Sequence, residues 1–286
     1  MGMESSKTLG VDAVSGSGPG VWGDGIARSW VRWLYRGVDT TRRVGAFTLI
    51  SLGALFTQRR VAPKVIGPLV QEQVFRAGVR VLPIVFFLGA ALGLVIVGQT
   101  VLLLVQVGQG TLVGPMMITV MVRELAPLTA ALVVLARVGT ATVTELGTAR
   151  AMGEVEALEV LGIDPVHYLV VPRLVGFSVA TVSLTTFIAA VSMVSGYVSA
   201  FLRGLPMTPG EFMWAVISAL SWMDFPLLGL KSLGFGVVTS MVICHHGLAQ
   251  PLRIEEVGQV TTRTVAHALV GCLVLDGLFL PFYLSL

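Results

Sequence analysis

The hydrophobic pattern of this chain is dominated by long stretches without charge. Residues 81–122 contain no ionisable side chain, and residues 174–202 contain no charged one. A helix needs about 20 apolar residues to cross the hydrocarbon core of a bilayer. The pattern therefore predicts an all-α integral membrane protein with five transmembrane helices, at about residues 81–105, 115–142, 174–202, 211–244 and 264–285.

The N-terminal part follows a different pattern and predicts three regions along the chain. Residues 1–25 are rich in Gly and Ser and predict a disordered tail. Within the membrane-surface region 26–76, residues 26–43 carry arginines at every fourth position on one helical face and tryptophans on the other. This distribution favours an N-terminal interfacial helix over an ordinary solvated amphipathic one. Residues 44–56 are apolar but too short to span, and residues 77–286 form the predicted transmembrane domain.

Charge and composition refine this interpretation. Hydrophobic residues make up 55% of the chain and charged residues 12%, against about 25% charged in soluble domains. Eleven of the 19 Lys and Arg residues precede Leu82, which indicates contact with an anionic membrane surface and not with nucleic acid. Basic residues also mark the segments 143–163 and 245–263. The positive-inside rule then predicts a cytoplasmic N-terminus and a C-terminus on the opposite side.

Among the ionisable residues inside the predicted spans, we take Arg123, Glu124, Asp224 and Lys231 as the candidate intramembrane charges. Such groups are costly in a membrane and usually face a bundle interior or a wet cavity. Asp224 and Lys231 share one helical face, whereas the neighbours Arg123 and Glu124 do not, so we expect each of these two to find a partner on another helix. A structural ion-pair network and a binding zone for a polar ligand group are both open at this point.

Two further patterns concern the third span and the segment before it. Serines and threonines recur along one stripe of residues 178–199, which favours close helix packing over a cavity lining. In the charged segment 143–161, Glu145, Glu156 and Glu159 fall on one side of a continuous helix. On another side, Arg150 and Glu154 have the spacing of an i, i+4 ion pair. A solvated loop is the plain alternative for this segment.

Several stretches resemble the MlaE/YrbE permease family. They are REL-P at 123–127, the long block ARVGTATVTELGTARAMGEVEALEVLGIDPVHYLVVPRL at 136–174, TTRTV at 261–265, and the Asp224 to Lys231-Ser232 spacing. The resemblance covers about residues 44–286, and its central block is long enough to be specific. Residues before 44 lie outside it.

The resemblance implies the membrane subunit of an ABC transporter, working as a homodimer. Many members of the family lie in a bacterial inner membrane, which would make the outer side with the C-terminus periplasmic, and relatives also exist in plastids. The resemblance also implies a cytoplasmic ATPase partner, an MCE-domain lipid-carrier protein as a second partner, and phospholipids or related lipids as cargo. Residues 143–161 would be the cytoplasmic coupling helix between spans two and three, with Glu145, Arg150, Glu154, Glu156 and Glu159 docking the ATPase. Arg123 or Lys231 would then meet a lipid phosphate.

Other chemistries are less well supported. Leu230 precedes Lys231-Ser232 where a phosphate loop requires Gly, so we expect ATP to bind a separate chain and this chain to hold no cofactor and to be no enzyme. His245 and His246 have no acidic or cysteine cluster around them that would complete a metal site. Two alternatives remain. One is an ion-coupled secondary transporter with Glu124 or Asp224 as proton site, and the other is a passive membrane scaffold.

Overall fold

In a computed structural model of the chain, the described residues are 53, 63–204, 208–248 and 257–284, without the side chains of 63–65 and 284. The chain divides into two units, Met1–Gly45 and Ala46–Leu286, and the described residues belong to the second. The predicted tail and interfacial helix lie outside the described residues, as does the short apolar segment 44–56 apart from Gly53.

Among the described residues, five helical runs are long and apolar enough to cross a membrane, as the sequence predicts: Ile66–Gln106, Gly110–Ala151, Val166–Leu202, Asp224–Leu248 and Val257–Tyr283. The first run contains α2 (Pro63–Ala77), η1 (Val79–Val81), α3 (Leu82–Leu92), η2 (Gly93–Val97) and α4 (Gly98–Gln106). The second contains η3 (Gly110–Leu112), α5 (Val113–Met117), η4 (Ile118–Leu125), α6 (Ala126–Val134), η5 (Leu135–Gly139) and α7 (Thr140–Ala151). The remaining elements are α8 (Glu154–Val160), η6 (Val166–Val170), α9 (Val171–Leu202), α10 (Pro209–Ala219), α11 (Asp224–Leu248) and α12 (Val257–Leu284).

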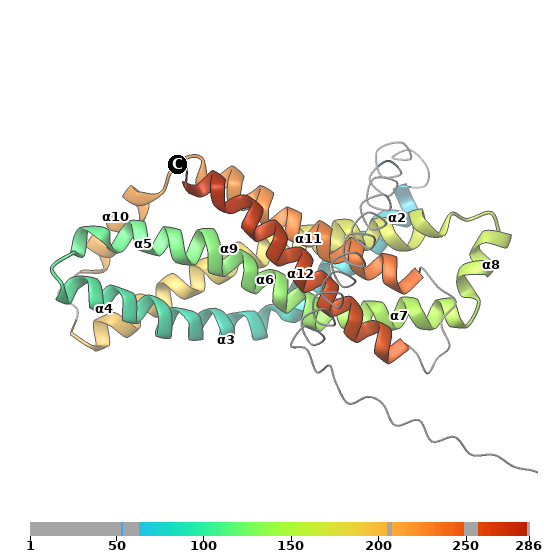
Figure 1. The fold of residues 1–286 in the computed structure, drawn as a ribbon, viewed down its shortest axis with the longest axis horizontal. Helices are drawn as coiled ribbons and strands as arrows, with labels where there is room; N and C mark the ends of the chain where they lie inside the picture. The colour runs from blue at the N-terminus through green and yellow to red at the C-terminus, as the bar shows by residue number, and fades with distance from the viewer. Residues whose placement is uncertain (1–52, 54–62, 205–207, 249–256, 285–286) are drawn as a thin grey trace, which may run out of the picture. The chain divides into compact units, whose positions relative to one another are not determined.

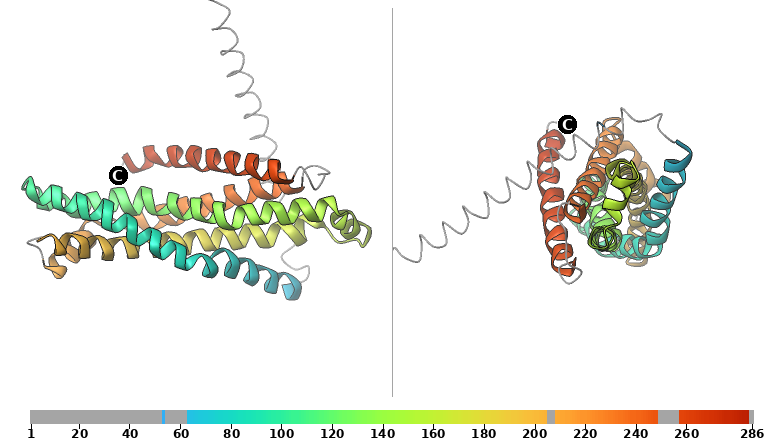
Figure 2. Two further views of the ribbon diagram at one scale, coloured as in Figure 1. Left: turned by 90° about the horizontal axis from the view of Figure 1, so that it is seen from below. Right: turned by 90° about the vertical axis from the view of Figure 1, so that its right-hand side faces the viewer.

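The helix α9 is the centre of the bundle. It packs against α2, α3, η2, α6 and α11, while α12 packs against α11 and α7 (Figure 1). Seen end-on, α12 and α2 lie on opposite flanks of the bundle (Figure 2). Phe177 and Ile188 of α9 and Phe235 of α11 are fully buried in this interior. The short helix α8 lies at one end, which we call the α8 end, and the turn before α5 lies at the other (Figure 1).

The polar stripe of α9 is a packing surface, which confirms the favoured interpretation. Thr181 and Thr185 are buried, and each donates its hydroxyl to a carbonyl of the preceding turn, at 2.7 Å. Ser199 donates to the carbonyl of Leu94 on η2, at 3.2 Å. Small side chains that return their hydroxyls to backbone carbonyls let neighbouring helices approach closely.

α11 approaches α9 closely at Gly236, which yields a test of packing. A Cβ at Gly236 would lie 2.5 Å from the Cα of Ser178, so Gly236→Ala forces the two helices apart. We expect this change to cost about 1–3 kcal/mol of stability. Gly229→Ala on the same helix is the matched control, because a Cβ added at Gly229 would meet nothing within 4 Å. Thermal unfolding in detergent measures both, and equal midpoints would contradict the crossing.

Several predicted span boundaries are wrong. The first and third runs begin at Ile66 and Val166, earlier than the predicted starts at 81 and 174. The predicted fourth span, 211–244, is two helices, because α10 ends at Ala219 and α11 starts at Asp224. The backbone amide of Ser221 donates to the carboxylate of Asp224 at 2.9 Å, which stabilises the start of α11. Pro226 therefore lies in the first turn of α11, where proline is tolerated, and breaks no helix.

The second span is also longer than predicted. At 1.5 Å per residue, the 42 residues of Gly110–Ala151 extend about 60 Å, twice the thickness of a hydrocarbon core. Charged side chains return along α7 while the helix itself continues to Ala151. The predicted 143–161 helix is consequently the end of α7 followed by α8. The two are separated at Met152 and Gly153, where Gly153 has a left-handed φ of 78°.

Candidate functional site

A cluster of charged side chains lies inside the bundle where η4, α11 and α12 meet. Arg123 and Glu124 come from the π-helical segment η4, Asp224 and Lys231 from α11, and Asp276 from α12. Five ionisable residues from three helices are thus brought together within candidate membrane spans. We call this set the intramembrane cluster.

Arg123 forms an ion pair with Asp224 across the η4–α11 contact. Its Nε lies 2.8 Å from Oδ1 of Asp224, although these two atoms are not aligned for a hydrogen bond. The other oxygen of Asp224 accepts the backbone amide of Ser221. The Arg123 side chain remains 16% exposed, although its Nε is buried.

Lys231 is the most deeply buried member of the intramembrane cluster, with a side chain that is 0% exposed. Its ammonium donates to Oε2 of Glu124 at 2.9 Å and to the backbone carbonyl of Arg123 at 2.8 Å. It also lies 2.8 Å from Oδ1 of Asp276, as an ion pair without hydrogen-bond alignment. A buried ammonium is tolerated when it is paired in this way. The three partners of Lys231 leave it little capacity for a ligand.

An aromatic ring closes one side of the intramembrane cluster. The ring centroid of Tyr283 lies 5.4 Å from the guanidinium carbon of Arg123 and 5.1 Å from Nζ of Lys231. These distances allow cation–π attraction to both cations. Nε of Arg123 and Oδ1 of both Asp224 and Asp276 are held by ion pairs without hydrogen-bond alignment. The hydroxyl of Tyr283 is buried and makes no hydrogen bond with the described residues, so it could donate to a polar ligand group.

The four intramembrane residues that the sequence predicted are brought together, and the partners of Arg123 and Glu124 do come from another helix, α11 in both cases. Sequence reasoning assigned no role to Asp276 or Tyr283. Asp276 could have been found as the acidic residue within the fifth apolar stretch. Nothing in the sequence marks Tyr283, which joins the cluster only through the antiparallel packing of α11 and α12.

The predicted coupling residues divide into two groups. Glu154, Glu156 and Glu159 lie on α8, whereas Glu145 and Arg150 lie on α7. The expected i, i+4 pair of Arg150 with Glu154 is wrong, because the helix breaks between them. Arg150 instead forms an ion pair with Glu156, at 3.3 Å. The shared face of Glu145, Glu156 and Glu159 also assumed one continuous helix and does not exist.

The helix α8 stands over an apolar hollow at the α8 end. The hollow, about 250 Å³ in volume, is lined mainly by apolar residues of α7, α8 and η6, among them Ala149, Val155, Leu158, Leu161 and Tyr168. Val160 and Leu161, of which Leu161 also lines the hollow, are largely exposed. Exposed apolar side chains on a short charged helix are typical of a protein-binding surface.

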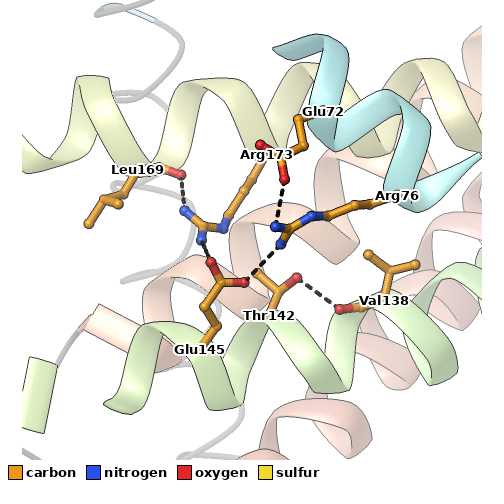
Figure 3. A network of polar contacts seen from close by, with 7 residues as sticks. All are labelled: Glu72, Arg76, Val138, Thr142, Glu145, Leu169 and Arg173. Carbon is orange, nitrogen blue, oxygen red and sulfur yellow. Dashed lines mark hydrogen bonds and ion pairs between the residues drawn. The ribbon is translucent and has the colours of Figure 1, made fainter. Parts of the chain in front are cut away.

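Glu145 faces the bundle and not the tip of α8 (Figure 3). Its Oε1 lies 3.1 Å from Nη2 of Arg173 on α9, and its Oε2 lies 3.5 Å from Nη1 of Arg76 on α2. Arg173 also donates to the carbonyl of Leu169 at 2.8 Å, and Arg76 pairs with Glu72 at 2.6 Å. Glu145, on α7, therefore links α7 to both α2 and α9 at the α8 end.

The described residues contain no group of three or more metal-ligating side chains. His246 and His267 come within 3.2 Å of each other, from Nε2 to Nδ1, and Nδ1 of His246 lies 2.9 Å from the carbonyl of Val242. A donor on His267 and an acceptor on His246 satisfy this geometry, so the pair reads as a hydrogen bond between α11 and α12.

A profile of the MlaE permease family matches residues 70–281. This range includes all of α8 and the whole intramembrane cluster, and it ends just before Tyr283. The chain belongs to the MlaE permease family. It is thus a permease subunit of an ABC transporter, a class of subunit that lacks the ATPase domain.

Individual MlaE-family relatives are distant. The chain is 31% identical over 201 residues to a "Probable ABC transporter permease protein" of Synechocystis sp., covering 70% of this chain and 76% of the relative. It is 28% identical over 242 residues to an "Intermembrane phospholipid transport system permease protein MlaE" of Haemophilus influenzae, covering 84% and 91%. It is 29% identical over 213 residues to "Protein TRIGALACTOSYLDIACYLGLYCEROL 1, chloroplastic" of Arabidopsis thaliana, covering 74% and 60%.

Proposed function

We propose that this chain is the permease of an ABC transporter that moves phospholipids or related lipids between the inner membrane and a periplasmic MCE lipid-carrier protein. The intramembrane cluster is the observation that carries the proposal. A passive anchor has no need for five ionisable side chains among its spans, whereas a protein that handles an amphiphile needs polar groups beside apolar walls. The intermembrane phospholipid system to which the Haemophilus relative belongs supports this cargo.

Arg123 is the group that meets the lipid phosphate in this proposal. The ammonium of Lys231 is fully buried and already surrounded by three partners, whereas the Arg123 side chain is 16% exposed and forms an ion pair with Asp224 alone. Guanidinium groups bind phosphate with short, charge-assisted hydrogen bonds. Lys231 then serves to hold Glu124 and Asp276 in place.

The composition of the intramembrane cluster also bears on the headgroup. It contains two basic side chains, Arg123 and Lys231, against three acidic ones, Glu124, Asp224 and Asp276. A ligand that brings only negative charge would add to this acidic excess. A headgroup that carries an amine as well as a phosphate would place its cation near the partly exposed Glu124 or Asp276.

A homodimer would enclose the lipid between two copies of the chain. In the apolar stretch of α12 only 17% of the residues are buried, whereas 56% of the residues in the apolar stretch of α11 are buried. Exposed side chains such as Val274 and Leu278 on α12 are available to acyl chains or to a second copy. Two such faces would form an apolar chamber with the polar intramembrane cluster at its wall.

The α8 end is proposed as the cytoplasmic docking site for the ATPase, with the N-terminus on the same side and the C-terminus in the periplasm. Glu154, Glu156 and Glu159 supply charge on α8, and Val160 and Leu161 supply exposed apolar area. The basic residues of segments 143–163 and 245–263 support this orientation. Closure of the ATPase would tilt α7 and α9 through α8, a switch between discrete arrangements.

Purification of the intact complex under mild detergent tests the function. We expect an ATPase and acyl lipid to accompany the chain, as identified by mass spectrometry, and ATP to drive lipid transfer to the MCE protein in vesicles. Loss of both companions would contradict the proposal. Transport that survives an inactive ATPase but stops without a proton gradient would instead support the ion-coupled alternative.

A substitution on α8 tests the docking site. Val160→Asp places a charge on a side chain that is 88% exposed, and we expect it to abolish capture of the ATPase while the permease stays folded. Val107→Asp is the matched control, since Val107 is 74% exposed at the opposite end of the bundle. Pull-down of the ATPase measures both variants. Normal capture by Val160→Asp would exclude this face.

A further inference from the structure

The α8 end contains a junction of charged side chains that pair with one another between helices of this chain. The junction consists of Glu72 and Arg76 of α2, Glu145 of α7 and Arg173 of α9 (Figure 3). Glu145 occupies its centre, because each of its two oxygens faces a different arginine from a different helix. Among the described residues, the other four predicted coupling residues form no ion pair with α2 or α9, and Arg150 and Glu156 pair with each other.

The strongest contact of the junction joins the two helices from which α8 projects. Arg173 is only 7% exposed, and its guanidinium binds the carboxylate of Glu145 across 28 residues of chain. It is held in place by a second hydrogen bond, to the carbonyl of Leu169. Removal of the single carboxylate would leave a buried guanidinium without a counter-charge, which proteins tolerate poorly. α7 and α9 are thereby clamped together at the base of α8.

The second contact brings α2 into the same unit. Arg76 reaches Glu145 while its orientation is held by Glu72, one turn earlier on α2. Beside it, α2 crosses α9 at very close range. A Cβ at Gly176, three residues beyond Arg173, would lie 2.5 Å from Cβ of Gln73 on α2. The close packing of α2 on α9 and the neighbouring ion pairs of Glu145 both oppose sliding of α2 against α9.

We propose that Glu145 is a positioning residue that makes α2, α7 and α9 move as one body when α8 is displaced. The motion of the ATPase then reaches the first span as well as the second and third. Because α2 continues through η1 into α3, the first span would tilt together with α7 and α9. This inference rests on the proposed docking of an ATPase at α8, and it assigns Glu145 to force transmission and not to contact with the partner.

Lipid transfer and ATP hydrolysis, measured separately on the reconstituted complex, test the role of Glu145. We expect Glu145→Gln to lower ATP-driven lipid transfer by about fivefold or more, which is the size of a typical coupling between sites. Arg76→Gln removes only the exposed arm, so transfer falls by about two- to fivefold with ATP hydrolysis at the wild-type rate. Arg80→Gln is the matched control, because Arg80 lies one turn away over the ring of Phe75 and outside the junction.

A distance measurement separates positioning from simple stabilisation. Spin labels at Gln71→Cys on α2 and Ala141→Cys on α7 occupy exposed positions. We expect their separation to stay constant between nucleotide-free and ATP-bound complexes of otherwise wild-type protein, and to change in Glu145→Gln and Arg76→Gln. A separation that already changes without these substitutions, or wild-type transfer by both variants, would overturn the inference. If the proposed function itself is wrong, the wild-type complex shows no ATP-driven transfer at all.

Discussion

Lys231→Met is expected to destabilise the protein more than any other single change in the spans. The substitution keeps the length of the side chain but removes the only ammonium between Glu124 and Asp276. Two carboxylates then share an apolar interior without a counter-charge. Breaking a buried ion pair from one side costs about 3–5 kcal/mol.

A thiol-reactive dye measures this loss of stability directly, because Cys244 and Cys272 are free and buried and react only when the protein unfolds. We expect a marked fall in the unfolding midpoint of Lys231→Met. Partial recovery is expected when Glu124→Gln and Asp276→Asn are added, since the unpaired charges are then removed together. Arg203→Met, at the end of α9, is the control for loss of a basic residue at an exposed site. An unchanged midpoint in Lys231→Met would show that the cluster is not structural.

Arg123→Ala is expected to abolish lipid transport while the complex still assembles. The guanidinium is the cluster's partly exposed cation, and its loss removes the proposed phosphate contact. Hydrogen bonds to charged groups are worth about 1.5–3 kcal/mol, so transfer should fall by about ten- to a hundredfold. Transfer of labelled phospholipid between vesicles measures the effect, and size-exclusion chromatography with the ATPase reports assembly.

Arg123→Lys separates charge from geometry at the same position. A lysine keeps the charge opposite Asp224 but loses the planar fork that binds phosphate through two hydrogen bonds. We expect this variant to assemble normally and to transport at an intermediate rate. Full transport by Arg123→Ala would remove this residue from the mechanism. Loss of the complex itself would favour a purely structural role for the cluster.

Much of the fold could be predicted because lipid imposes a simple rule on sequence. Apolar stretches long enough to span are visible by composition alone, and five of them were predicted and found. The small-residue stripe of α9 also indicated close packing correctly, since Thr181 and Thr185 have no other reason to recur at helical spacing in an apolar stretch.

Helix ends were predicted less well, because they depend on local hydrogen bonds and on where the membrane stops. The second span was predicted to end before the charged segment that begins near residue 143, yet α7 continues to Ala151. At the break before α11, the carboxylate of Asp224 accepts the backbone amide of Ser221, inside a stretch that is largely apolar. Hydropathy averages over such stretches and misses a single turn.

By itself, the sequence determined that this protein is helical, lies in a membrane, and buries Arg123, Glu124, Asp224 and Lys231 at a cost that demands partners. Tertiary structure alone decided which partners these are. It placed Asp276 and Tyr283 in the cluster and turned Glu145 toward Arg173 and Arg76. The physical reason is that hydrophobicity is a property of each segment, whereas an ion pair requires two atoms within a few ångströms, which only the packing of separate helices can supply.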